Sequence, residues 1–272
     1  MKTIQVLSAR PDSFKTYLLK IWQNRALITT LAKRDLKIKY AQTFFGVLWV
    51  MLHPLPSVII FTFFFDRLIQ VDTGPLPYPI FALIGMTGWY FFTNLAFGAG
   101  NSLIESQQLL KKLAFPKLIL PLSKVLSTGV DFIMSFFITI LAMFLFSVYP
   151  GYTVVFLPLF ILLNIFIGLT LGIWLCAVSF RYRDVHHFLP NVVNFLVWLT
   201  PVFYPTTILP EKLHYLMYIN PIALVIEGYR FSLTGMALPS PWYALSMIPV
   251  LILFLVGITY FRKIEDKIVD YI

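Results

Sequence analysis

The stretch LTPVFYPTTILPEKLHYLMYINPIALVIEGYR, residues 199–230, decides how the fold must be read. It is nearly as apolar as its neighbours, yet four prolines interrupt it: Pro201, Pro205, Pro210 and Pro221. A membrane-spanning helix needs about 20 consecutive apolar residues, and each proline removes a backbone donor and clashes with the preceding turn. Broken backbone at membrane depth is tolerated only where protein or a water-filled cavity covers it. The stretch therefore predicts a re-entrant gate or the lining of a cavity.

This segment predicts short helices before and after Asn220-Pro221 that dip into the membrane and return. Within the second one, Glu227 and Arg230 lie three residues apart, so an ion pair would let both charges stay near the bilayer. We favour that structural pairing over direct contact with a substrate, which stays open. The residues that we expect to shape the gate are Tyr204, Pro205, Pro210, Asn220, Pro221, Glu227 and Arg230.

The composition indicates a membrane protein. The chain has 272 residues, of which 59% are hydrophobic and only 12% charged, which excludes a disordered or ordinary soluble protein. Its single cysteine, Cys176, lies in an apolar block, so there is no disulfide framework. The first forty residues are basic and mixed, unlike a cleavable signal, so we expect them in the mature protein. One polytopic all-α membrane domain is the expected fold class.

The basic residues follow the membrane and do not indicate nucleic acid, despite a formal charge of +9. They alternate between loops, and by the positive-inside rule 18 of the 21 fall on the cytoplasmic side together with both termini. An even number of spans follows from that parity. The six expected spans are Phe44 to Phe65, Tyr78 to Ala99, Leu126 to Tyr149, Val154 to Phe180, Phe188 to Tyr204, and Trp242 to Phe261.

Residues 1–43 are expected to form a separate cytoplasmic region before a transmembrane domain at 44–272. Between Phe14 and Ala32, apolar residues recur at helical spacing among lysines and arginines. This pattern predicts an amphipathic helix at the cytoplasmic interface, although a soluble helix packed on a partner stays open. Two charged connections, around residues 102–122 and 180–187, should form a short helix and a short elbow on the same side. Anchoring to anionic lipid would explain them equally well.

The sequence contains none of the common nucleotide-binding or metal-binding motifs. It contains no G-x-x-x-x-G-K-[ST] phosphate loop, no H-E-x-x-H pair and no paired cysteines. His186 and His187 are adjacent, so on a helix they would diverge by about 100° and hardly share a metal. We expect no catalytic residue, no metal and no cofactor in this chain.

Asp131 is the one carboxylate inside an apolar block, where a charge costs roughly 2.5 to 3.5 kcal/mol. It could reach the interface or pair with Lys124. A role in a proton relay is the weaker alternative.

Aromatic residues make up 17% of the chain, and most are expected to face lipid or the core, with Trp and Tyr near the interfaces. A few could instead line a channel, where their ring faces would slide along the C–H faces of sugar rings. The candidates are Trp89, Tyr90, Trp198 and Phe203.

Four separated segments resemble one family, the ABC-2 type permeases that export polysaccharides such as O antigen, teichoic acid and capsule. RDLKIKYAQTFFGVLWVMLHPL at 34–55 resembles the start of that family's first span. FPKLILPLSKVL at 115–126 and SFRYRDV at 179–185 resemble its two cytoplasmic connections. TPVFYPTTILPEKLHYLMYINP at 200–221, closing on GYR at 228–230, resembles the segment after its fifth span.

The resemblance implies a permease of the bacterial cytoplasmic membrane that works as a homodimer with two separate ATP-binding cassette subunits, which would bind the ATP and magnesium. It implies a lipid-linked polysaccharide, carried on undecaprenyl diphosphate, as the cargo. Residues implied to contact the ATPase are Glu105, Ser106, Lys111, Lys112, Phe115, Arg181, Tyr182, Arg183 and Asp184. Residues implied to lie beside the channel entrance are Arg34, Asp35, Lys37, Lys39 and Tyr40.

Other classes stay open. An ABC-2 exporter of teichoic acid, capsule, a drug or a small lipid is the nearest alternative. An ion-driven secondary transporter would usually need several buried acids or an inverted repeat, and the sequence offers only Asp131. An integral enzyme of lipid or glycan transfer would need facing carboxylates or a His-Asp pair, which we do not find.

Overall fold

A computed structural model describes residues 13–41, 46, 48–52 and 54–268, apart from the side chains of 180, 181, 183, 186, 187, 211 and 266–268. The described elements are all helical. The expected boundary between residues 43 and 44 lies outside the described residues. The helices are α1 Phe14–Gln23, α2 Arg25–Tyr40, α3 Leu48–Leu52, α4 Pro54–Phe61, η1 Thr62–Leu68, α5 Tyr78–Glu105, α6 Gln107–Leu110, α7 Ile119–Leu145, η2 Tyr152–Phe156, α8 Leu157–Arg181, α9 Arg183–Leu196, η3 Val197–Leu199, η4 Thr206–Ile208, α10 Glu211–Ile219, α11 Pro221–Thr234, η5 Pro241–Ser246 and α12 Met247–Ile268.

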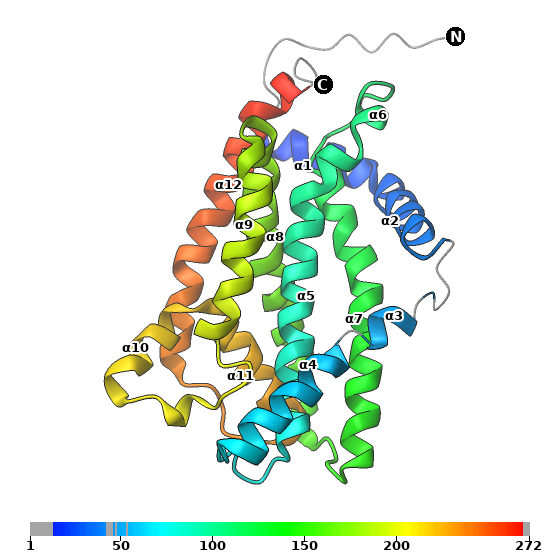
Figure 1. Cartoon of the computed structure of the whole chain (residues 1–272). Coiled ribbons are helices and arrows are strands. Elements are labelled where there is room, and N and C mark those ends of the chain that lie inside the picture. The colour runs from blue at the N-terminus through cyan, green and yellow to red at the C-terminus, as the bar shows by residue number, and fades with distance from the viewer. Residues whose placement is uncertain (1–12, 42–45, 47, 53, 269–272) are drawn as a thin grey trace, which may run out of the picture.

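Helix α5 forms the centre of the bundle (Figure 1). It is apolar around most of its circumference, as a helix surrounded by other helices must be, and it packs against α7 and α8 along its length. Helix α12 packs on the far side of α8, and α11 fits between the lower halves of α5 and α8. The core is therefore built around α5.

Five helical stretches within the described part are long and apolar enough to cross a membrane: Leu48–Leu68, Tyr78–Glu105, Ile119–Leu145, Tyr152–Ser179 and Pro241–Glu265. The chain is thus a multi-pass membrane protein. The six-span count is not confirmed, because the expected fifth span has an apolar helix only from Phe188 to Leu199. At about 1.5 Å per residue that helix covers about 18 Å, well short of a hydrocarbon core of about 30 Å. It ends where Pro201 breaks the chain.

Two expected helices differ from the structure at the end of the bundle that holds α1, α2 and α6. The N-terminal helix is divided at Asn24 into α1 and α2. The helix expected near Glu105 to Phe115 is only the four-residue α6, because α5 continues unbroken to Glu105. Helix α7 begins at Ile119, earlier than expected, since Pro121 falls in its first turn, where a missing N–H costs little.

The basic connections gather at one end of the molecule. Helices α1, α2 and α6, the α8–α9 turn and the end of α12 lie together at the top of Figure 1. The connections between η1 and α5 and between α7 and α8 lie at the opposite end, and α10 lies in the same lower half. The alternation of charge along the sequence therefore corresponds to two physical ends.

Helices α5 and α8 approach closely through small residues. A Cβ added at Gly172 would lie 2.5 Å from the Cβ of Ala99 and 3.1 Å from the carbonyl oxygen of Ala96. Gly172→Ala is therefore expected to lower the thermal stability of the purified protein, by about 1–3 kcal/mol for an overpacked helix contact. Gly129→Ala is the matched control, since nothing lies within 4 Å of that Cβ. Equal melting temperatures for both variants would contradict this packing.

Candidate functional site

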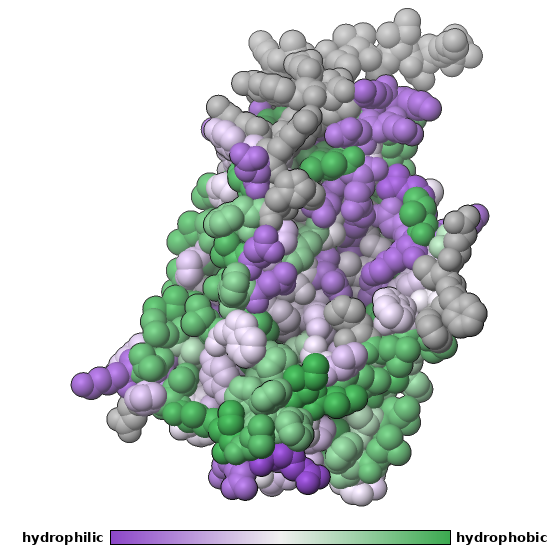
Figure 2. Space-filling view, in the orientation of Figure 1, coloured by the Kyte–Doolittle hydropathy of each residue, from purple (hydrophilic) through white to green (hydrophobic). Residues whose placement is uncertain are grey.

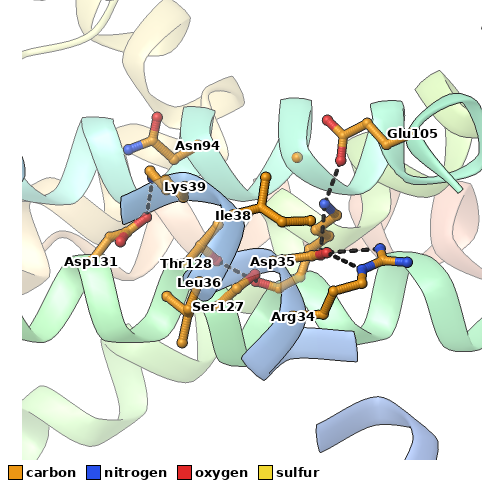
Figure 3. Close-up of a pocket in the computed structure, with 12 residues that line it drawn as sticks. Arg34, Asp35, Leu36, Ile38, Lys39, Asn94, Glu105, Ser127, Thr128 and Asp131 are labelled. Carbon is orange, nitrogen blue, oxygen red and sulfur yellow. Dashed lines mark hydrogen bonds and ion pairs between the residues drawn. The ribbon is translucent and has the colours of Figure 1, made fainter. Parts of the chain in front are cut away.

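A cavity of about 560 Å³, lined mostly by charged and polar residues, lies between α2, α5 and α7. Figure 2 shows the hydrophilic surface around it, between α2 and α5 in the upper half of the molecule, above a largely apolar lower half. Figure 3 shows side chains from the three helices converging on it. Its lining consists of Arg34, Asp35, Leu36, Ile38, Lys39, Asn94, Gly98, Glu105, Lys124, Ser127, Thr128 and Asp131.

Lys124 joins the three helices at one end of this cavity. Its ammonium nitrogen on α7 lies 2.9 Å from a carboxylate oxygen of Asp35 on α2 and 2.5 Å from Glu105 on α5. Arg34 holds the other oxygen of Asp35 at 2.7 Å and also donates to the hydroxyl of Ser106 at 3.3 Å. Lys124 is buried, and the two carboxylates compensate its charge. This network anchors α2 to the bundle.

Asp131 forms a second polar contact at the other end of the cavity. Its carboxylate lies 2.5 Å from the ammonium of Lys39 and accepts a hydrogen bond from the hydroxyl of Tyr40. Of the two alternatives for Asp131, the pairing with Lys124 is not found, because Lys39 of α2 pairs with Asp131 and Asp35 of α2 pairs with Lys124. Burial, followed by the bond to Asp131 and its charge, raises the pKa of the Tyr40 phenol. Tyr40 therefore stays protonated and donates.

The cavity is polar but electrically balanced. Three cations and three carboxylates line it, and each of the six belongs to one of the ion pairs just described. Among the described residues, no three His, Cys, Asp or Glu side chains converge as a metal site would require. Asn94, Ser127 and Thr128 add polar groups without a nucleophile–base pair. Such a surface can hold helices together and stay hydrated, but it offers no evident catalytic chemistry.

A second polar site lies at the proline-broken stretch in the lower half. The guanidinium of Arg230 on α11 is fully buried and stacks on the ring of Phe81, 3.4 Å from the ring centroid. It donates to the carbonyl oxygens of Pro201 at 2.7 Å and Val202 at 2.8 Å. The predicted Glu227–Arg230 ion pair is present, at 3.0 Å. Arg230 thus satisfies the acceptors that the broken helix leaves free.

Two other side chains hold the same stretch. Tyr78 at the start of α5 donates to the carbonyl of Phe203 at 2.8 Å. Asn220 caps α11 by accepting from the N–H of Ile222 at 3.0 Å, and it donates to the hydroxyl of Thr200 at 2.9 Å. Helices therefore begin and end on each side of Asn220-Pro221 as expected.

The remaining gate candidates have different surroundings. Tyr204 is half-buried and donates to the carbonyl of Trp198 at 3.0 Å, whereas Pro205 is buried. Pro210 is exposed and precedes α10, and Pro221 occupies the first turn of α11. In that first turn a proline is well tolerated, so Pro221 starts a helix and does not break one.

The residues expected at the channel entrance and at the ATPase contact fall into two groups: some lie at the cavity and others are exposed. Arg34, Asp35 and Lys39 line the cavity and Tyr40 contacts Asp131, but Lys37 is exposed and does not line it. Two coupling candidates face inward: Glu105 toward Lys124 and Ser106 toward Arg34. Phe115 is half-buried, whereas the exposed candidates are Lys111, Lys112, Tyr182 and Asp184. Arg181 ends α8 and Arg183 begins α9, but their side chains lie outside the described part.

The aromatic candidates are also divided. Trp89 and Phe203 are buried in the chain's own core, where Phe203 stacks on Phe61 at 3.7 Å between ring centroids. Tyr90 is half-buried and Trp198 is exposed. Of these four candidates, only Tyr90 and Trp198 have side-chain surface that is accessible outside the core.

Sequence reasoning overlooked Tyr78 and Thr200, and it gave Lys124 the wrong partner. Each of these contacts joins residues from separate elements. The one signal in the sequence for a polar site here was that Lys124 and Asp131 lie in the same apolar helix.

The sequence profile of the family described as ABC-2 type transporter matches residues 26–234. The O-antigen export system permease protein RfbA of Klebsiella pneumoniae is 25% identical over 245 residues, covering 90% of this chain and 94% of that protein. The protein of the same name from Myxococcus xanthus is 27% identical over 251 residues, covering 91% of this chain and 96% of that protein. The chain therefore resembles these permeases over nearly their whole length.

Proposed function

The chain belongs to the ABC-2 type transporter family, and from that membership we propose that it is the membrane-spanning subunit of an ATP-driven exporter of O-antigen polysaccharide. The observation that carries this proposal is the similarity to two O-antigen export permeases across 90% or more of the chain. The bundle of long apolar helices supports it, as does a sequence without a phosphate loop. ATP hydrolysis, with its magnesium, is then assigned to a separate subunit.

We place the protein in the bacterial cytoplasmic membrane, with the end that holds α1, α2 and α6 in the cytoplasm. The excess of lysine and arginine in the connections at that end supports this orientation. Residues 1–43 then precede the transmembrane domain, and α1 and α2 lie at the membrane surface. Phe14, Leu18 and Trp22 on α1 are exposed apolar residues that would enter the headgroup region.

On this proposal the short helix α9 and the broken stretch after it form a membrane-embedded gate, and α10 and α11 re-enter from the outer side. The protein works as a homodimer, and a channel for a sugar chain lies between the copies. Of the four candidate aromatics, Tyr90 and Trp198 have surface to offer that channel. The cargo is a glycan linked to undecaprenyl diphosphate.

An ion-driven transporter is the less favoured alternative. Its proton-carrying candidate would be Asp131, but that carboxylate is held by Lys39 and Tyr40. These contacts join α2 to α7, so they give Asp131 a structural role that needs no proton transfer. The structure supports a role for Asp131 in holding α2.

Loss of this chain from its host is expected to remove O antigen from the cell surface and to accumulate lipid-linked polymer inside the cell. Gel analysis of lipopolysaccharide and mass spectrometry of undecaprenyl-linked glycan measure both effects. Restoration by a plasmid copy is the control. Normal surface O antigen together with missing capsule or teichoic acid would contradict the O-antigen assignment. ATPase stimulation by small amphiphiles alone would instead indicate a drug or lipid exporter.

The connection between α5 and α7, residues 106–118, which we call the elbow, gives a separate prediction. Lys111 and Lys112 are exposed at its tip, where we propose that it contacts the ATPase subunit. Replacing both with glutamate should weaken co-purification of that subunit about tenfold, because reversing two charges at an interface removes its electrostatic complementarity. Lys33→Glu and Lys37→Glu, two exposed positions on α2, form the matched control pair. Unchanged co-purification of the elbow variant would remove these lysines from the interface.

A further inference from the structure

Glu265 is a buried carboxylate that neither the gate nor the cavity uses. It lies in the last turns of α12 and is 9% exposed. A carboxylate in such a place needs hydrogen-bond partners, since burying it alone is costly. Its partners come from two segments far away in the sequence.

The first partner is Tyr17 on α1. Its hydroxyl donates to Oε2 of Glu265 at 2.6 Å, and the guanidinium of Arg262 lies over its ring, 4.9 Å from the centroid. Burial, and then the charge and hydrogen bond of Glu265, raise the pKa of the Tyr17 phenol, so it remains a donor. This contact ties α1 to the end of α12.

The second partner is Lys117, where the elbow between α5 and α7 ends. Its backbone N–H donates to Oε1 of Glu265 at 2.5 Å. Its ammonium group donates to the backbone carbonyl of Glu265, one of the helix-end acceptors that α12 does not satisfy itself. The side-chain carboxylate and the backbone carbonyl of Glu265 therefore both bind Lys117.

The tip of the elbow is exposed at residues 111–114, whereas Leu110 is buried and Leu109 and Phe115 pack against the same apolar cluster. Polar contacts add to this packing at the two ends of the elbow. Glu105 is held there by Lys124, and Lys117 is held by Glu265.

We propose that Glu265 is a positioning residue of the exporter, which holds the elbow at the angle needed to receive force from the ATPase subunit. It contacts neither cargo nor nucleotide and acts through Lys117. The part of this inference that concerns force rests on the proposed function. The part that concerns the elbow's position does not.

The test uses the full chain with a nitroxide label at Leu113→Cys, an exposed position in the elbow. The native Cys176 is buried, so the label should go to residue 113. Glu265→Leu fills a similar volume without either acceptor. It is expected to raise the mobile component of the spin-label spectrum about tenfold, as fits the loss of hydrogen bonds to a charged group. Glu265→Gln should restore most of the immobile signal, because its amide oxygen can still accept from Lys117.

Lys263→Leu is the matched control, since it removes an exposed charge from the same turn. An unchanged spectrum for Glu265→Leu, or an equal rise for Lys263→Leu, would overturn the proposal. If Glu265→Leu does not reach the membrane, it is combined with Tyr17→Phe. This second change removes the hydroxyl donor that has lost its acceptor at residue 265. Failure of that double variant to fold would also overturn the proposal, since Glu265 would then serve folding and not elbow position.

A second readout addresses transport. Glycan exported per ATP hydrolysed, measured in vesicles with the ATPase subunit, should fall about tenfold in Glu265→Leu and recover in Glu265→Gln. A mobile elbow with an unchanged ratio would overturn the coupling role. If the wild-type chain moves no glycan at all while Glu265→Leu still frees the label, the proposed function fails and the positioning of the elbow stands.

Discussion

Replacing Arg230 with methionine is expected to cause the largest loss of stability of any single substitution in the lower half of the molecule. The guanidinium is fully buried and donates to the carbonyls of Pro201 and Val202 and to Glu227. Without it, these acceptors and one carboxylate remain in an apolar environment. Breaking a buried charge pair in this way costs about 3–5 kcal/mol. The melting temperature of the purified protein and its amount in membranes measure the effect.

Two further variants make this prediction specific. Arg230→Lys keeps the charge but cannot reproduce the planar fork that reaches two carbonyls at once, so we expect an intermediate loss. Arg67→Met removes an exposed arginine from η1 and should be close to neutral. A stable Arg230→Met protein that still exports would mean that the broken stretch does not depend on this side chain.

The sequence allowed much of the fold to be predicted, because apolar length is a local property. The prolines of residues 199–230 correctly indicated helices that break around Asn220-Pro221. The expected fifth span is not confirmed, because its apolar pattern continues past Leu199 while its helix does not. The start of the elbow was misjudged because the expected second span ended at Ala99, whereas packing keeps α5 helical as far as Glu105.

The candidate sites were predictable only where both partners belong to one helix. Glu227 and Arg230 are three residues apart, so their pairing follows from helix geometry. Asp131 and Lys124 also share a helix, and this made their pairing attractive, yet α2 supplies Lys39 and Asp35 instead. Which of several oppositely charged groups will meet depends on how helices pack, and a single sequence does not contain that information.

Lys124→Met is expected to impair export while leaving the chain in the membrane. Lys124 links Asp35 on α2 with Glu105 on α5, so its loss removes one of the links between α2 and the two helices that border the elbow. The stability cost should be about 1–3 kcal/mol, typical of a lost hydrogen bond to a charged group. Glu105 is half-exposed and can turn to water, and Arg34 still holds Asp35. Export should fall at least about tenfold if α2 must keep its place.

A double-mutant cycle separates this link from the general loss of a charge. Lys124→Met and Asp35→Asn, made singly and together, should show an interaction energy of about 0.5–3 kcal/mol, since the two residues are in contact. Lys39→Met is the comparison, because Lys39 is half-exposed and Tyr40 still bonds Asp131 without it. Its effect on both stability and export should be smaller. Strictly additive losses for Lys124 and Asp35 would show that the contact does not hold α2, and wild-type export by Lys124→Met would separate the cavity from transport.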